Sequence, residues 1–168
     1  MSNDDPAPPA VAVGEVLTEA DETLAVAESA TGGLVCSLLT DVPGSSAYLN
    51  RGYVTYAYEA KSGELGVSRE ALDEHGAVSE PVARAMARGA RDSAGTDWAV
   101  SVTGIAGPGG ASDEKPVGRT YIGVAHAAPW GTQDSWVTAK RYTFEGDRMG
   151  IKRAAAEQAL TDLVSAIQ

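Results

Sequence analysis

Apolar positions along this chain alternate between two periods, and the alternation predicts an α/β protein. Three short apolar runs, at residues 24–27, 51–58 and 97–102, have the length and composition of strands. Two further segments, 118–125 and 135–144, alternate apolar and polar residues on either side of a turn and predict a hairpin. The pattern therefore predicts five strands.

Between these runs, apolar residues recur at the spacing of helices that bury one face. The expected helices cover residues 11–22, 31–40, a short stretch from 59, 68–76, 79–93 and the segment from 147 to the C-terminus. Their expected N-caps include Ser68, Ser79 and Asp147. Strands that alternate with helices, followed by a hairpin and a closing helix, predict a three-layer α/β/α sandwich with a mixed β-sheet.

The first ten residues, MSNDDPAPPA, differ in composition from the rest of the chain. We expect residues 1–10 to form a disordered acidic tail and residues 11–168 to form a single domain. The tail lacks the basic and apolar segments of a secretory signal, and no apolar run is long enough to span a membrane. Cys36 is the only cysteine, and its apolar neighbours favour a core thiol over a catalytic one. These features predict a cytoplasmic protein.

The formal net charge of −10 argues against binding to nucleic acids or to anionic membranes. Four lysines stand against nine arginines among the 13 basic residues. An acidic surface that is poor in lysine is compatible with a halophilic protein in a high-salt cytoplasm, and equally with an ordinary acidic protein. The composition leaves both interpretations open.

The stretch AESATGG, at residues 27–33, is the first candidate for chemistry. It joins the strand at 24–27 to the next helix, so it combines a strand end, a tight turn and a helix N-terminus. Free backbone N–H groups at such a turn bind phosphate or a developing oxyanion. Ser29 lies at the start of this turn and is the candidate nucleophile. The expected substrate-binding residues around it are Ala30, Thr31, Gly32 and Gly33.

A serine hydroxyl needs a base before it becomes a good nucleophile, and this chain has only two histidines. Lys61 lies among aromatic residues that include Tyr56, and burial would lower the pKa of its amine enough for it to act as the base. Ser29, Lys61 and Tyr56 together predict acyl transfer or amide hydrolysis. The competing interpretation is a serine that caps a helix and a lysine at a solvated strand end.

The second candidate is TGIAGPGG, at residues 103–110, which follows the strand at 97–102. Four glycines in eight residues indicate backbone that comes close to a ligand. Their order differs from the dinucleotide-binding fingerprint, and the chain contains neither a Walker A motif nor His or Cys pairs at metal-ligand spacing. We therefore expect neither an organic cofactor nor a metal.

Seven motifs span nearly the whole chain after the tail. They are AESATGG (27–33), TDVPGSSA (40–47), RGYVTY followed by EAK (51–61), EHGAVSEPVARAMA (74–87), TGIAGPGG (103–110), EKPVG (114–118) and GDR (146–148). In this order they resemble the C-terminal domain of the competence-damage protein CinA. Stand-alone members of that family are nicotinamide-nucleotide amidases, which hydrolyse nicotinamide mononucleotide (NMN) to nicotinate mononucleotide and ammonia.

The resemblance implies a role for several residues. Ser29 matches the nucleophile in the family's Glu-Ser-Cys-Thr-Gly-Gly motif, and Tyr56 and Lys61 match its Tyr-x-Asn-x-x-Lys motif. Candidates for binding the substrate and its 5′-phosphate become Thr103, Gly104, Gly107 and Arg148. The resemblance also implies a homo-oligomer that acts on a small molecule without a cofactor.

Two positions depart from the family pattern. Ala30 replaces the usual cysteine, which should leave the turn intact, and Tyr58 replaces the usual asparagine, so that a phenol stands in place of a candidate substrate-binding amide. Three functions stay open: an NMN amidase that works through an acyl-enzyme, a non-catalytic nucleotide-binding regulatory module, and an amidase for another small phosphorylated carboxamide. Full-length CinA proteins carry an N-terminal domain, whose activity we do not expect here because only a short tail precedes the first helix.

Overall fold

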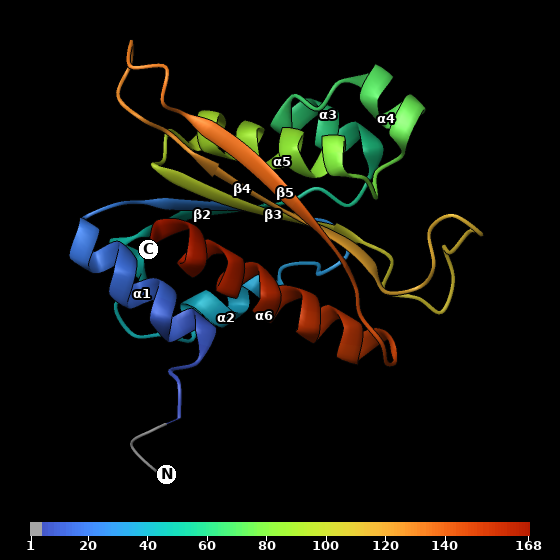
Figure 1. Ribbon diagram of the computed structural model, residues 1–168, viewed down its shortest axis with the longest axis horizontal. Helices are drawn as coiled ribbons and strands as arrows, with labels where there is room; N and C mark the ends of the chain where they lie inside the picture. Colours follow the sequence, from blue (N-terminus) through green and yellow to red (C-terminus); the bar gives the residue numbers. More distant parts are fainter. Residues whose placement is uncertain (1–4) are drawn as a thin grey trace.

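A five-stranded mixed sheet lies between two layers of helices in the computed structural model, which describes residues 5–168 (Figure 1). The strands are β1 (Leu24–Glu28), β2 (Leu49–Val54), β3 (Trp98–Gly104), β4 (Arg119–His126) and β5 (Trp136–Thr143). The helices are α1 (Pro9–Ala20), α2 (Leu34–Thr40), α3 (Tyr58–Leu65), α4 (Arg69–His75), α5 (Glu80–Ala94) and α6 (Arg148–Ile167), with a 3-10 turn, η1 (Ser45–Ala47). The predicted three-layer α/β/α sandwich is confirmed.

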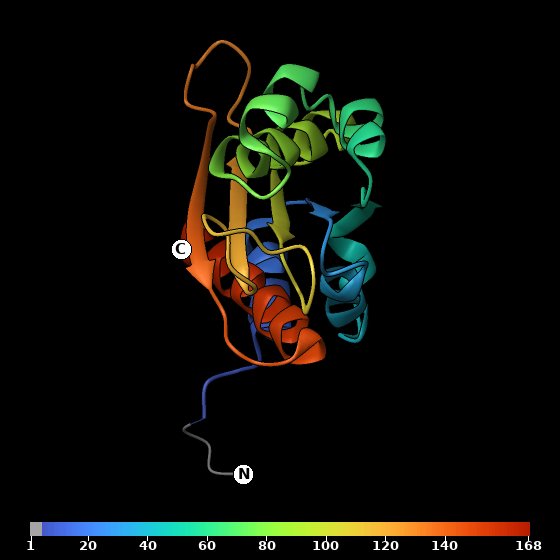
Figure 2. The same cartoon turned by 90° about the vertical axis from the view of Figure 1, so that its right-hand side faces the viewer.

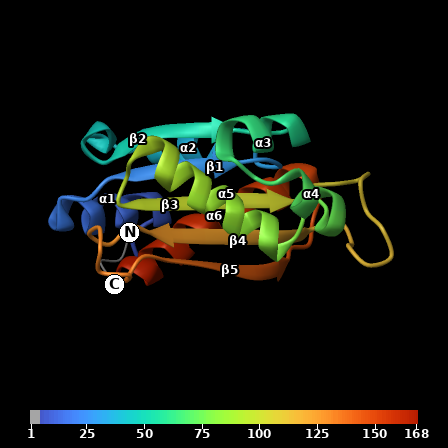
Figure 3. The same ribbon diagram turned by 90° about the horizontal axis from the view of Figure 1, so that it is seen from above.

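The strand order β2-β1-β3-β4-β5 creates a crevice at one edge of the sheet. β1 runs parallel to β2 and to β3, whereas β4 is antiparallel to both β3 and β5. The chain leaves β1 through α2 on one face to reach β2, and then crosses through α3, α4 and α5 on the other face to reach β3 (Figure 3). Ligands of such sheets bind outside the carboxyl ends of the strands where the connections diverge, here at the ends of β1 and β3.

β1 is buried on both faces because it lies inside the sheet and both layers of helices cover it. Leu24 and Val26 pack into the core formed with α1, α2 and α6, whereas Ala25 and Ala27 face the core formed with α5. Alternation along the strand places Glu28 on the same side as Leu24 and Val26, toward α2. The next residue, Ser29, follows the end of the strand at the crevice.

Several predicted boundaries change in the structure. α1 begins at Pro9, so residues 9 and 10 are helical although we placed them in the tail; residues 1–4 of that tail lie outside the described residues. β2 ends at Val54, four residues before the predicted end of the strand. The helix predicted from residue 31 begins at Leu34, because Gly32 and Gly33 have φ values of 59° and 103°, outside the right-handed helical region.

The predicted N-caps are confirmed. The side chains of Ser68, Ser79 and Asp147 accept hydrogen bonds from backbone N–H groups in the first turns of α4, α5 and α6. Each cap depends on residues within one turn, which is why the local sequence predicts it. Within residues 5–168, no helix has the length and the apolar character needed to cross a bilayer.

Candidate active site

A cavity of about 260 Å³ opens at the carboxyl ends of β1 and β3. Figure 2 looks onto this edge of the molecule, where the loop after β3 and the first turn of α6 face the viewer. The cavity is lined by most of the site residues predicted from sequence: Ser29, Ala30, Tyr56, Lys61, Thr103, Gly104, Gly107 and Arg148. These residues come from four separate segments of the chain, which meet here.

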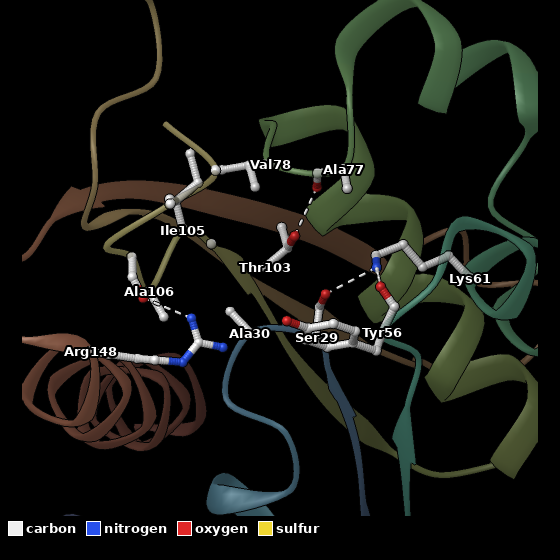
Figure 4. Close-up of a pocket in the computed structure, with 14 residues that line it drawn as sticks. Ser29, Ala30, Tyr56, Lys61, Ala77, Val78, Thr103, Ile105, Ala106 and Arg148 are labelled. Carbon is white, nitrogen blue, oxygen red and sulfur yellow. Dashed lines mark hydrogen bonds between the residues drawn. The ribbon is translucent and has the colours of Figure 1, made fainter. Parts of the chain in front are cut away.

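The centre of the cavity holds a direct contact between Ser29 and Lys61 (Figure 4). The Nζ atom of Lys61 lies 3.0 Å from the Oγ atom of Ser29. The same Nζ atom donates to the carbonyl oxygens of Thr55, at 2.7 Å, and Tyr56, at 3.2 Å. Tyr56 thus contacts Lys61 through its main chain, while the residue as a whole is 65% exposed. The lysine is completely buried.

Burial prepares Lys61 to accept a proton. It lowers the pKa of the amine from 10.5 to about 8, and within residues 5–168 no carboxylate forms an ion pair with it. A neutral amine has two N–H bonds and one lone pair. With the two N–H groups directed at the carbonyls of Thr55 and Tyr56, the lone pair is left for the hydroxyl of Ser29. This geometry suits a general base.

The turn after Ser29 supplies fewer free N–H groups than predicted. The N–H of Gly32 donates to the carbonyl of Ser29, and that of Gly33 donates to the carboxylate of Glu28. Within residues 5–168, the N–H groups of Ala30 and Thr31 donate to no other group. Only these two remain as candidate oxyanion donors of the predicted four.

The remaining predicted residues lie around the cavity. Thr31, Gly32 and Gly33 line an adjoining cavity of about 330 Å³, beside Lys152. Tyr58 lines neither of these cavities. Its hydroxyl accepts a hydrogen bond, at 3.3 Å, from the N–H of Ala77 in the connection between α4 and α5.

Arg148 places a positive charge on the far side of Ser29 from Lys61 (Figure 4). The residue opens α6, and its guanidinium donates to the carbonyl of Gly107 at 2.7 Å. Within the described part of the chain the guanidinium pairs with no carboxylate. The single bond to Gly107 leaves most of its five N–H donors for an anionic ligand in the cavity.

Part of the cavity wall comes from residues that were not predicted from the sequence. Ala77 and Val78 line it, and the hydroxyl of Thr103 donates to the carbonyl of Ala77 at 2.8 Å. Neither side chain carries a reactive group, so the only signal was their place in the motif at 74–87. The other lining residues that were not named individually belong to the predicted glycine-rich loop: Ile105, Ala106, Gly109 and Gly110.

Other catalytic chemistries find less support. Cys36 lies half-buried on α2, and burial, with the nearby charge of Glu28, raises the pKa of its thiol to about 12, so the thiol stays protonated at neutral pH. Within residues 5–168, no three His, Cys, Asp or Glu side chains come together as a group that could hold a metal ion. Ser29 therefore remains the candidate nucleophile.

Comparison with known sequences gives relatives over most of the chain. A "CinA-like protein" from Geobacter sulfurreducens is 52% identical over 149 residues, which cover 89% of this chain and 34% of that protein. This chain thus spans about a third of the length of the first curated relatives it matches. "Nicotinamide-nucleotide amidohydrolase PncC" from Escherichia coli is 47% identical over 151 residues, covering 90% of this chain and 88% of that enzyme.

Solved structures show the same fold. The competence/damage inducible protein CihA from Agrobacterium tumefaciens superimposes with a TM-score of 0.87 at 36% identity, covering 97% of this chain and 98% of that one. A CinA superfamily protein from Escherichia coli gives a TM-score of 0.87 at 29% identity, covering 99% and 93%. The family model described as the CinA C-terminal domain matches residues 7–167. The chain therefore belongs to the CinA C-terminal domain family.

Proposed function

We propose that this chain is a nicotinamide-nucleotide amidase that hydrolyses NMN to nicotinate mononucleotide and ammonia. The observation that carries the proposal is the 3.0 Å contact between the hydroxyl of Ser29 and the buried amine of Lys61, because it pairs a nucleophile with a base of lowered pKa. The amidohydrolase name of the Escherichia coli relative, which aligns with 90% of this chain, supports the choice of substrate.

In the first half of the proposed reaction, Ser29 Oγ attacks the carboxamide carbon of NMN while Lys61 Nζ takes the hydroxyl proton. The carbonyl oxygen becomes an oxyanion, and the N–H groups of Ala30 and Thr31 are the donors available to it. The tetrahedral intermediate then breaks its C–N bond as the ammonium form of Lys61 returns the proton to the leaving nitrogen. Ammonia departs, and the acyl group, which still carries the ribose 5′-phosphate on its pyridine ring, remains on Ser29 as an ester.

The second half hydrolyses this ester. Lys61 is neutral again, so it can take a proton from a water molecule that attacks the ester carbon. Collapse of the second tetrahedral intermediate breaks the bond to Ser29 Oγ, which recovers its proton from Lys61. The product is the carboxylic acid of nicotinate mononucleotide, which releases its proton to solvent and leaves as the carboxylate. One base thus serves both halves, and no step requires a metal.

Ammonia release from NMN by the purified wild-type protein tests the proposal directly. The assay is run at low and at multimolar potassium chloride, because an acidic protein adapted to salt would fold and turn over only at the higher concentration. We expect ammonia and nicotinate mononucleotide in equal amounts. Binding of NMN without ammonia release under both conditions would instead favour the regulatory module, and release from other phosphorylated carboxamides alone would identify a related amidase.

Arg148 is expected to recognise the 5′-phosphate. Replacing it with alanine should raise the KM for NMN by roughly 10- to 100-fold, since a charge-assisted hydrogen-bonding partner of the phosphate is lost. Nicotinamide riboside lacks the phosphate, so its kcat/KM should change little in the same variant. Steady-state kinetics with both substrates make the comparison. Arg153→Ala is the matched control, because Arg153 lies on the same helix but pairs with Glu157; equal losses for both substrates in Arg148→Ala would contradict phosphate recognition.

A further inference from the structure

Glu28, the last residue of β1, is a carboxylate with no exposed surface directly before the candidate nucleophile. Its Oε1 atom accepts from the hydroxyl of Thr31 at 2.7 Å and from the N–H groups of Gly33 at 3.2 Å and Val35 at 2.8 Å. Its Oε2 atom accepts from the N–H of Cys36 at 3.1 Å. Four donors thus compensate a buried charge that has no cationic partner within residues 5–168.

These bonds replace an ordinary helix cap. Gly33 occupies the N-cap position of α2 and has no side chain to accept from the first turn. Glu28 takes that role from five residues earlier, across the turn that contains Ser29. The chain on either side of the turn is therefore tied together, and the N–H of Ser29 is anchored to the carbonyl of Val102 in β3 at 3.0 Å.

The carboxylate lies on the opposite side of the strand end from the reacting groups. It contacts neither the hydroxyl of Ser29 nor the amine of Lys61, whose lowered pKa arises from burial. Its bonds occupy the N–H groups of Gly33, Val35 and Cys36, whereas those of Ala30 and Thr31 donate to no other group in the described part of the chain. Any influence of Glu28 on the reaction must therefore pass through the shape of the turn.

We propose that Glu28 is a positioning residue for the nucleophile and for the oxyanion donors. By joining the end of β1, before the turn, to Thr31 and to the first turn of α2, after it, Glu28 holds Ser29 Oγ against Lys61 and keeps the N–H groups of Ala30 and Thr31 directed away from α2. Reactions of this kind are sensitive to displacements of about 1 Å, because the attacking atom and the oxyanion donors must be aligned together. This inference rests on the proposed amidase function.

Three variants test the inference. Glu28→Gln keeps the shape but puts an NH2 group where one carboxylate oxygen accepts, and Thr31→Val removes only the 2.7 Å bond and leaves the charge in place. Asp162→Asn is the matched control: Asp162 is another buried carboxylate, 8% exposed, which accepts from Tyr142 and Gln158 between β5 and α6. All three are expected to lower the melting temperature, so kinetics are measured where circular dichroism shows each variant folded.

A positioning role predicts a split between kcat and KM. Glu28→Gln should lower kcat for NMN on the order of 100-fold, and Thr31→Val about tenfold, while KM stays within about threefold because substrate binding in the ground state is unchanged. Asp162→Asn should keep the wild-type kcat. If Glu28→Gln does not fold, Thr31→Val decides the matter by itself.

The result that would contradict the proposed function differs from the result that would contradict the positioning role of Glu28. A wild-type protein that releases no ammonia from NMN contradicts the proposed function. An active wild type whose kcat survives in Thr31→Val and in any folded Glu28→Gln, or falls equally in Asp162→Asn, overturns the positioning role alone.

Discussion

Replacing Ser29 with alanine is expected to reduce kcat for ammonia release from NMN by a factor on the order of 10⁴ or more. The substitution removes the Oγ atom that lies 3.0 Å from the amine of Lys61. In the proposed mechanism this is the atom to which the acyl group becomes bonded. The base and the candidate oxyanion donors remain, but they have no nucleophile to activate. Steady-state ammonia release, extended to long incubations, measures the loss.

The same variant should still fold and bind NMN. Ser29 contributes a small hydroxyl, and Lys61 keeps its bonds to the carbonyls of Thr55 and Tyr56 without it. Calorimetric titration with NMN should therefore give a dissociation constant close to the KM-derived affinity of the wild type. Ser93→Ala, an exposed serine on α5, is the matched control and should be fully active. Ammonia release by Ser29→Ala at the wild-type rate would contradict the acyl-enzyme mechanism.

Replacing Lys61 with methionine should lower kcat/KM for NMN on the order of 10³-fold. Methionine fills the space of the buried stem but cannot accept a proton, so Ser29 must react as a neutral hydroxyl. Lys140→Met is the control, because Lys140 is an exposed lysine on β5, away from the cavity. The comparison uses ammonia release by both variants under identical salt conditions, after their folded state has been verified.

The pH dependence identifies the base. Only neutral Lys61 can accept a proton, so the kcat/KM of the wild type should rise about tenfold per pH unit at low pH and level off above the pKa of about 8. The sign of the pH dependence follows from the charge on Lys61. Protonation of its amine removes the base, so kcat/KM falls as the pH falls. The residual activity of Lys61→Met should lack this limb. An identical limb in the variant would assign the titration to another group.

The order of strands and helices could be predicted because it depends on neighbouring residues. The run Leu24–Ala27 is apolar because β1 is covered on both faces, and caps such as Ser79 and Asp147 act within one turn. Boundaries were less predictable where backbone conformation decides them. Gly32 and Gly33 adopt positive φ, which glycine permits but does not require, and so α2 begins at Leu34.

In the candidate site, too, some features could be predicted from the sequence and others could not. Ser29, Lys61 and the loop at 103–110 could be chosen from sequence because each combines a reactive or flexible residue with a strand end. The residue types alone could not show that the main-chain carbonyl of Tyr56 contacts Lys61, or that the hydroxyl of Tyr58 meets Ala77. A hydrogen bond to a backbone group depends on where two segments meet and leaves little trace in residue identity.

By itself, the sequence determined the α/β class and the strands and helices that flank the candidate site, because these follow from the periodicity of apolar residues. It also determined which reactive side chains are available there, because these follow from residue identity. Tertiary structure alone decided that Ser29 and Lys61 touch, since parallel strands on either side of β1 bring distant segments to one edge of the sheet. It also decided how two buried ionisable side chains are accommodated. Lys61 is removed from solvent and pairs with no anion within residues 5–168, so the pKa of its amine falls, whereas Glu28 accepts hydrogen bonds from four donors.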